Sequence, residues 1–226
     1  MSEALERRLA ARRRAELVSS LRQLARPVSA TTRTNGAPGN GGGPASESCD
    51  LCGNEIPPDH RHVLHLTERR ILCVCESCLA LRSGDPELRP SGTRVVWLDD
   101  FELSDELWAR FQIPIGLAFF LRDSAAGRVV ALYPSPAGAT ESELDLDAWD
   151  ELGAANPALA DLEADAEALI VNRMGEPPQH AIAPIDECYR LVGLIKASWE
   201  GISGGVGPEE AIEGFFDELR VRSASR

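Results

Sequence analysis

The residues best suited to chemistry in this chain of 226 residues are its cysteines, five of which fall between positions 49 and 78. Four of them form two Cys-x-x-Cys pairs, Cys49 with Cys52 and Cys75 with Cys78, separated by 22 residues. Zinc prefers four soft ligands in a tetrahedron, and a Cys-x-x-Cys turn brings two thiolates to one ion. Gly53 allows the left-handed backbone that such a turn needs. The spacing therefore predicts a four-thiolate metal site.

Three further side chains could replace one of these ligands. Cys73 lies two residues before Cys75 on the same strand face, so it could bind instead of Cys75. We favour Cys75 because it completes the second Cys-x-x-Cys pair, which leaves Cys73 as a small buried apolar residue. His60 and His62 are the substitutes to consider if one cysteine does not bind. Otherwise we expect them, with His65, on or near the hairpin surface.

The identity of the metal is a separate question from its position. Zinc is the default for a closed site of four thiolates, while iron in a rubredoxin-like site uses the same ligands. Leu79 follows Cys78 where rubredoxins usually have glycine, which disfavours iron. A zinc ion with four thiolates has no open position, so such a site is structural rather than catalytic.

A β-hairpin is expected to carry the second cysteine pair to the first. Residues 62–74, HVLHLTERRILCV, have the pattern strand, turn, strand. We therefore expect residues 49–82 to form a small zinc-ribbon-like module. The fold class predicted for the chain is α+β, with a mixed or antiparallel sheet and packed helices in an acidic domain of residues 83–226.

Periodicity places the elements of that acidic domain. Strands are expected at 93–98, 115–121, 128–133, 168–172 and 180–183. Helices are expected at 105–111, 146–155 and 158–168, and then in two C-terminal segments with apolar stripes from Cys188 to Trp199 and from Ile212 to Leu219. The segment from Tyr133 to Pro136 is expected to end a strand and turn the chain.

The N-terminal residues differ in composition from the rest. Residues 1–26 predict an Arg-rich amphipathic helix or tail, and residues 27–48 a disordered Gly/Pro/Ser linker. The start has no apolar stretch typical of a secretory signal, and the chain has no run of 18 apolar residues. We therefore expect a cytoplasmic protein without a membrane span.

Charge disfavours nucleic acid as a partner. The net charge is −13, and residues 83–226 alone carry 27 acidic and 11 basic side chains. Nucleic-acid affinity depends on Lys and Arg that neutralise phosphates, so this acidic part would repel them.

An enzyme site in the acidic domain is the alternative reading. Residues 141–167 hold ten acids and no Lys or Arg, which predicts a solvated face, although Glu141–Asp147 could also bind a hard cation. Cys188 lies on an apolar stripe and is expected in the core, although with His180 it could act as a nucleophile. Neither a G-x-S-x-G nor an H-E-x-x-H motif occurs.

Several segments resemble an uncharacterised bacterial protein family whose members are commonly encoded beside [NiFe]-hydrogenase genes. They are CDLCGNEIPPDHRHVLHL, ILCVCESC, DDFELSDELWARFQIPIGLAFF, VVALYPSPAGATES, ALIVNR and PIDECYRLVGLIKASWEGISGG. The resemblance covers roughly residues 49–222. It implies a setting in hydrogenase assembly, regulation or electron supply, and it supplies no catalytic residues.

Together these observations predict a non-enzymatic metal-binding accessory protein, with a structural four-cysteine zinc site used for stability or docking. The expected partner is a protein, either a hydrogenase subunit or a maturation factor. The alternatives are a rubredoxin-like iron electron carrier for a hydrogenase, and an enzyme of unknown reaction in the acidic domain.

Overall fold

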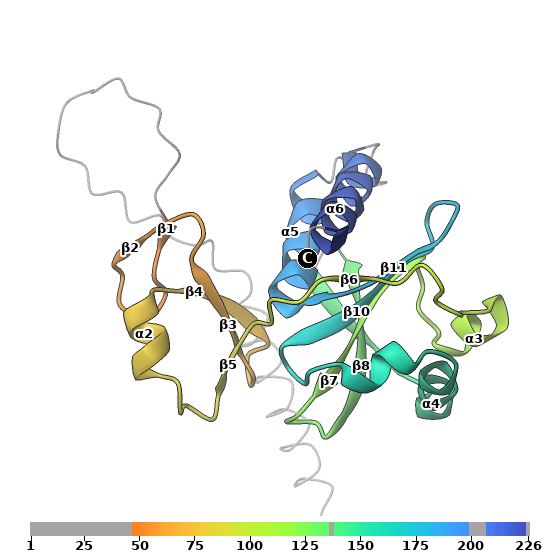
Figure 1. The fold of residues 1–226 in the computed structure, drawn as a ribbon, viewed down its shortest axis with the longest axis horizontal. Coiled ribbons are helices and arrows are strands. Elements are labelled where there is room, and N and C mark those ends of the chain that lie inside the picture. Colours follow the sequence, from red (N-terminus) through yellow and green to blue (C-terminus); the bar gives the residue numbers. More distant parts are fainter. Residues whose placement is uncertain (1–46, 136–137, 199–206, 225–226) are drawn as a thin grey trace, which may run out of the picture. The chain divides into compact units, whose positions relative to one another are not determined.

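A computed structural model of the chain describes residues 47–135, 138–198 and 207–224. These residues form an α+β fold with antiparallel sheets, as the sequence predicts (Figure 1). The predicted segments 1–26 and 27–48 lie outside the described residues, except for Glu47 and Ser48, which form a short strand. Within the described ranges, no helix combines the length and apolarity that crossing a bilayer requires.

The first four described elements are strands, and the later strands are interspersed with helices. The strands are β1 (Glu47–Ser48), β2 (Glu55–Ile56), β3 (Arg61–His65), β4 (Arg70–Val74), β5 (Leu88–Pro90), β6 (Val96–Trp97), β7 (Leu117–Asp123), β8 (Arg128–Ser135), β9 (Gly138–Ser142), β10 (Glu167–Asn172) and β11 (Gln179–Pro184). The helices are α2 (Glu76–Leu81), α3 (Asp105–Arg110), α4 (Leu146–Ala155), α5 (Ile185–Ser198) and α6 (Gly207–Ala224), with a 3₁₀ helix at Pro157–Asp161.

A central antiparallel sheet organises residues beyond β5. Its strand order among the described residues is β6-β11-β10-β7-β8-β9. Every residue of β10, Glu167–Asn172, is buried, because helices cover both faces of the sheet. The hairpin predicted from residues 115–121 and 128–133 is confirmed as β7 paired with β8, and the predicted pairing of residues 180–183 with residues 168–172 is confirmed as β11 with β10.

Successive side chains of β7 supply the two halves of the core. Phe119 lies on the face covered by α5 and α6, with its ring 6.1 Å from that of Tyr189. Phe120 lies on the opposite face, where it stacks on Trp149 of α4 at 5.6 Å. The alternation of side chains along a strand thus anchors a helical layer on each side.

Residues 47–90, called here the cysteine module, form two smaller antiparallel sheets. One pairs β1 with β2, and the other has the order β4-β3-β5. The predicted hairpin is confirmed as β3 and β4, which places His62 opposite Cys73. The module has its own small apolar core, formed by Cys49, Ile56, Val63, Leu72, Val74 and Leu88.

One prediction about local structure is wrong. The predicted helix 158–168 reaches only Asp161, and Asp165 then adopts a left-handed φ of 61°. The Asp165 carboxylate accepts the Ser124 N–H at 3.0 Å, so tertiary contacts override helix propensity there. The prediction that a strand ends within Tyr133–Pro136 and that the chain turns there is confirmed, since β8 ends at Ser135 and the antiparallel strand β9 begins at Gly138. β8 is two residues longer than the predicted 128–133, and β9 itself is not predicted from the sequence.

The buried His180 on β11 generates a prediction about pH. Its ring stacks on Phe101 at 4.6 Å, and burial together with the nearby charge of Arg173 lowers its pKa to about 4. The unfolded chain binds this proton near pH 6.5, so the unfolded state gains a proton before the folded state does. The contribution to stability is therefore present above pH 6.5 and is lost as the pH falls toward 4.

We expect the free energy of unfolding, measured by urea denaturation at pH 7 and pH 4.5, to fall less in His180→Gln than in the wild type. Carboxylates that titrate in this range contribute equally to both proteins, so the difference isolates His180. An identical fall in both proteins would contradict the assignment.

Candidate metal centre

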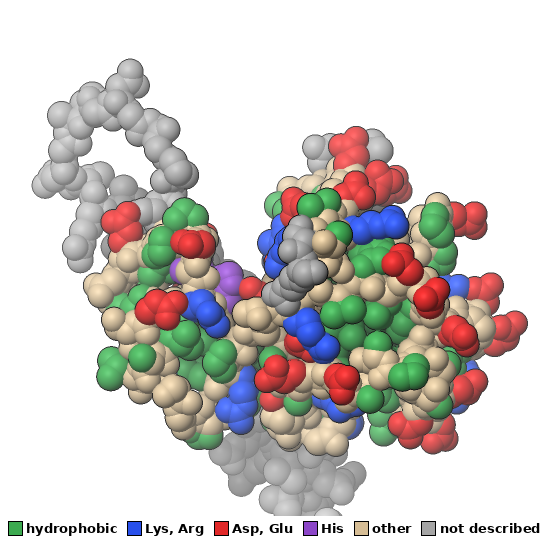
Figure 2. Space-filling model, in the orientation of Figure 1, with side chains coloured by type: hydrophobic (Ala, Val, Ile, Leu, Met, Phe, Trp, Pro, Cys, Tyr) green, Lys and Arg blue, Asp and Glu red, His purple; other side chains and the backbone are tan. Residues whose placement is uncertain are grey.

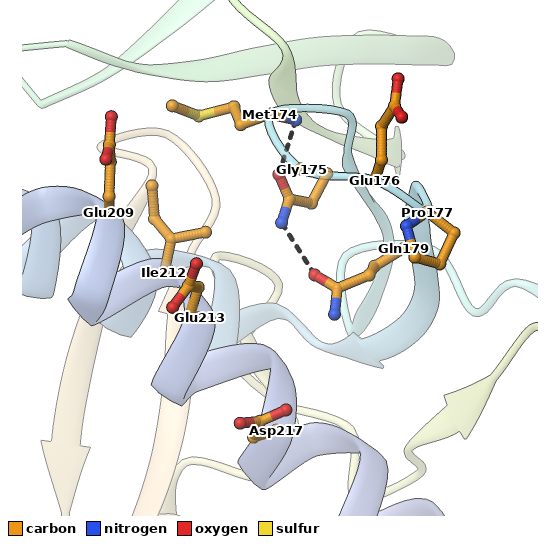
Figure 3. Close-up of a pocket in the computed structure, with 10 residues that line it drawn as sticks. Met174, Gly175, Glu176, Pro177, Gln179, Glu209, Ile212, Glu213 and Asp217 are labelled. Atoms are coloured by element: carbon orange, nitrogen blue, oxygen red, sulfur yellow. Dashed lines mark hydrogen bonds between the residues drawn. The ribbon is translucent and has the colours of Figure 1, made fainter.

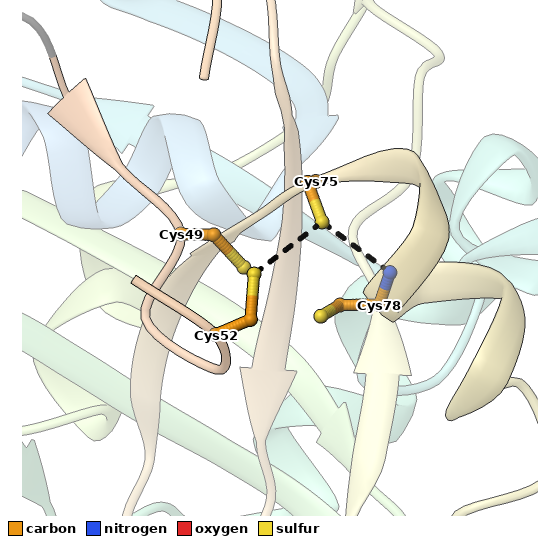
Figure 4. A group of neighbouring side chains, drawn as sticks. All are labelled: Cys49, Cys52, Cys75 and Cys78. Carbon is orange, nitrogen blue, oxygen red and sulfur yellow. Dashed lines mark hydrogen bonds between the residues drawn. The ribbon is translucent and has the colours of Figure 1, made fainter. Parts of the chain in front are cut away.

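The structure brings the four sulfur atoms of Cys49, Cys52, Cys75 and Cys78 together. They all lie within 4.8 Å of one another, and Cys52 Sγ is 3.8 Å from Cys75 Sγ. Figure 4 shows the four side chains pointing toward a common point from two separate segments. Four thiolates in this arrangement could hold a metal ion.

The first pair is positioned by a tight turn between β1 and β2. The Cys49 N–H donates to Asn54 O at 2.7 Å, and the Gly53 N–H donates to Cys49 O at 2.8 Å. Gly53 has a φ of 74°, a conformation in which a side chain would be strained, as the sequence predicts. Cys49 is buried at the base of this turn, and Cys52 is exposed at its tip.

The second pair occupies the start of α2. Cys75 is the N-cap residue, and its Sγ accepts the N–H of Cys78 at 3.4 Å. Because a helix N-terminus presents free N–H groups and a partial positive charge, it favours a thiolate at this position. One turn of helix then places the Cys78 sulfur on the same side as that of Cys75.

The pKa values of two of the four thiols are shifted in opposite directions. Burial raises the pKa of Cys49, but hydrogen bonds from the backbone of Cys75, Leu51 and Cys52 outweigh it and bring this pKa to about 6. The pKa of Cys78 is raised to about 12, chiefly by its hydrogen bonds with Cys52 and Cys75 and then by burial. Closely spaced sulfurs thus resist ionising together, and a cation among them would remove that repulsion.

The geometry also fits a tetrahedral ion. Bonds of about 2.3 Å from zinc to sulfur imply a separation of about 3.8 Å between two ligand sulfurs. The separation of Cys52 Sγ from Cys75 Sγ has this value. The four cysteines could therefore hold a metal ion, and the one sulfur–sulfur distance given above agrees with tetrahedral coordination.

The three alternate ligands lie outside this group. Cys73, His60 and His62 form a separate cluster, in which the potential ligand atoms also lie within 4.8 Å of one another. His65 joins neither cluster, and its Nδ1 accepts the Glu68 N–H at 3.3 Å. Sequence spacing alone placed Cys73 beside Cys75, but it did not reveal that a histidine lies directly across from Cys73 on the neighbouring strand.

Two of the acidic residues considered for an enzyme site, Glu141 and Asp145, form ion pairs. Glu141 binds Arg69 at 2.6 Å and Arg128 at 2.8 Å, while Asp145 caps α4 and binds Arg110 at 3.1 Å. Hydrogen bonds and charges of the arginines lower the pKa of Glu141, with Arg69 the main cause. These groups therefore hold elements together.

The proposed nucleophile Cys188 is fully buried in α5, as expected for a core thiol. Burial raises its pKa well above the ordinary value, which opposes formation of the thiolate. Its Sγ lies 3.9 Å from the carbonyl oxygen of Pro184. Among the described residues, neither Cys188 nor His180 belongs to a cluster of potential metal ligands.

A cavity of about 390 Å³ lies between α6 and the loop that joins β10 to β11 (Figure 3). Carboxylates from both sides line it, namely Glu176, Glu209, Glu213 and Asp217. Asn172 and Gln179 also line it, and the Asn172 side-chain N–H donates to Gln179 Oε1 at 2.9 Å. Among the described residues, the charged side chains that line this cavity are all carboxylates.

Comparison with known proteins places the chain in a family. No curated protein and no solved structure is significantly similar to it. The family of unknown function DUF5947 matches residues 48–223, a range that includes the four-cysteine group, the central sheet and nearly all of α6. The predicted resemblance to an uncharacterised family is thus confirmed, whereas its association with hydrogenase genes stays a prediction. The chain belongs to the DUF5947 family of unknown function.

Proposed function

We propose that the protein is a non-enzymatic metal-binding accessory protein, in which Cys49, Cys52, Cys75 and Cys78 bind one zinc ion. The observation that carries this proposal is the convergence of four sulfurs within 4.8 Å of one another. Four thiolates complete the tetrahedral coordination of zinc and leave no position for a substrate. The ion would therefore support structure and docking.

The cysteine module has a structural need for such an ion. Its separate apolar core is small, and β1 and β2 are only two residues long each. Domains with so little buried apolar surface usually depend on a metal or a disulfide. A zinc ion would join the β1–β2 turn to the start of α2, which are distant in sequence.

The second ligand pair supports zinc over rubredoxin-like iron. Cys75 caps a helix and Cys78 lies within it, so this pair does not form the glycine-containing turn that is usual in rubredoxins. Thiolates clustered without disulfides are also typical of a reducing compartment, which supports the cytoplasm as the location.

The proposed partner is a [NiFe]-hydrogenase subunit or maturation factor. The family resemblance described above supports this setting. Apolar side chains near the metal centre support docking, since Leu81 of α2 is 83% exposed and Leu51 of the first turn is 37% exposed. These two leucines are therefore the side chains whose contact with a partner we propose to test.

We expect the purified chain to be colourless and to contain tightly bound zinc, measured by elemental analysis. Cys52→Ser should lose one zinc per chain, whereas Cys188→Ala, which removes a core thiol, should keep the wild-type content. Since structural zinc contributes about 10–16 kcal/mol in zinc-finger peptides, Cys52→Ser should also lose hydrogen-exchange protection in the module while the central sheet keeps it. A red preparation that bleaches on reduction, or unchanged zinc in Cys52→Ser, would contradict the proposal.

We expect the full chain to co-purify with hydrogenase subunits or maturation factors encoded nearby. Leu81→Asp should weaken this complex at least about tenfold, because it places a charge in an apolar contact. Leu146→Asp, a change at an exposed leucine of α4, is the matched control and should retain binding. Absence of a complex under all nickel and redox conditions would contradict the hydrogenase proposal and leave the zinc proposal to its own test.

A further inference from the structure

A second group of potential metal ligands lies beside the four-cysteine group. His62 on β3 and Cys73 on β4 are direct partners in the antiparallel register, so their side chains share one face of the hairpin. The ring of His60, just before β3, lies 4.7 Å from that of His62 in an edge-on arrangement. The ligand atoms of all three residues lie within 4.8 Å of one another.

The ring of His60 has a buried nitrogen without a hydrogen-bond partner. Its side chain is only 4% exposed, and Nδ1 donates to Pro57 O at 2.9 Å, with a Glu47 carboxylate oxygen at 3.3 Å. A proton on Nδ1 leaves Nε2 as a lone-pair acceptor, and this atom is buried and has no partner among the described residues. A buried acceptor without a partner costs free energy, and a metal ion would satisfy it.

The ring of His62 is oriented by a carboxylate from outside the module. Its Nδ1 donates to Asp186 Oδ2 at 2.7 Å, and the other oxygen of Asp186 accepts the Ser91 hydroxyl at 2.5 Å. Metal-binding histidines commonly donate one ring N–H to a carboxylate or a backbone carbonyl, which leaves the other nitrogen for the ion. His62 and His60 have one of these two arrangements each.

Cys73 is held by the first cysteine turn. Asp50 Oδ2 accepts the Cys73 N–H at 2.7 Å, and the Asp50 N–H donates to Cys73 O at 2.8 Å. These bonds fix the backbone of β4 while the half-buried thiol faces the histidines. Figure 2 shows histidine side chains, in purple, within the cysteine module.

We propose that His60, His62 and Cys73 bind a second metal ion, separate from that of the four cysteines. Two imidazoles and one thiolate suit a divalent transition metal of intermediate softness such as Zn²⁺. Three atoms spaced by at most 4.8 Å lie within about 2.8 Å of a common centre, so small side-chain rotations produce normal bonds of about 2.0–2.3 Å.

The two sites differ in what they can do. Four cysteines close the coordination of their ion, whereas three protein ligands leave a fourth position for water or for a ligand from a partner. The ion of the second site could therefore bind an external ligand at its fourth position, and it could exchange more readily than the ion of the four cysteines. This inference rests on its own three residues and holds whether or not the partner is a hydrogenase.

The test is a titration of the reduced, metal-free full chain with Zn²⁺, in the presence of a chelator that suppresses weak binding to surface carboxylates. The wild type should bind two equivalents. His62→Ala and Cys73→Ser should each bind one, while His65→Ala, a histidine of the same strand outside both clusters, should bind two. A single equivalent in the wild type, or two equivalents in both His62→Ala and Cys73→Ser, would overturn the second site.

Spectra with Co²⁺ as the probe distinguish a lost site from a misfolded chain. Cys73→Ser should retain the thiolate-to-cobalt absorption of the four-cysteine group and lose only the second step of the titration. Asp186→Asn acts through the orientation of His62, so it should weaken the second equivalent about 10–100-fold and leave the first unchanged. Equal weakening of both equivalents, or of neither, would overturn the positioning role of Asp186.

Discussion

The repulsion among four closely spaced sulfurs is the constraint on which the cysteine module depends. Each sulfur is delivered by a segment with its own hydrogen bonds: a glycine-containing turn for Cys49 and Cys52, and a helix start for Cys75 and Cys78. Such segments hold the sulfurs near one another, although thiolates at this spacing disfavour a common ionised state. A divalent cation converts that repulsion into attraction, so metal and fold are expected to stabilise each other.

The module is also joined to the central sheet by specific contacts. Arg69, at the tip of the β3–β4 hairpin, binds Asp123 and Glu141, each at 2.6 Å. His62 binds Asp186 in the first turn of α5, and Leu64 belongs to the same apolar core as α5 and α6. The described residues accordingly belong to one compact unit. A change in the orientation of His62 would therefore be transmitted to α5, the helix that covers one face of the sheet.

The parts of the structure that sequence could predict are those set by local pattern. The Cys-x-x-Cys pairs and Gly53 indicated the four-cysteine group, and the apolar period from Cys188 onward indicated α5. The helix predicted at 105–111 is α3, Asp105–Arg110, and the Ser104 hydroxyl at its N-terminus accepts the Leu107 N–H. In each case the residues that determine the structure are neighbours along the chain, so their spacing is sufficient.

The parts that sequence missed depend on distant partners. Residues 162–166 have helix-forming composition, but Asp165 is fixed by Ser124. The strand β9 is held by its antiparallel pairing with β8, in which Pro134 lies opposite Ala139. The prolines before β9 indicate a turn but do not indicate that a further strand follows it. The cluster of His60, His62 and Cys73 required the register of β3 with β4, and its carboxylate partner lies 124 residues further along the chain.

The most direct test of the central claim is X-ray absorption spectroscopy at the zinc edge of the Cys73→Ala chain loaded with one equivalent of zinc. This variant retains the four-cysteine group and lacks the thiolate of the second cluster. The account predicts a single shell of four sulfur atoms at about 2.3 Å from the ion. A shell with fewer than four sulfurs, or one that includes nitrogen or oxygen, would contradict it.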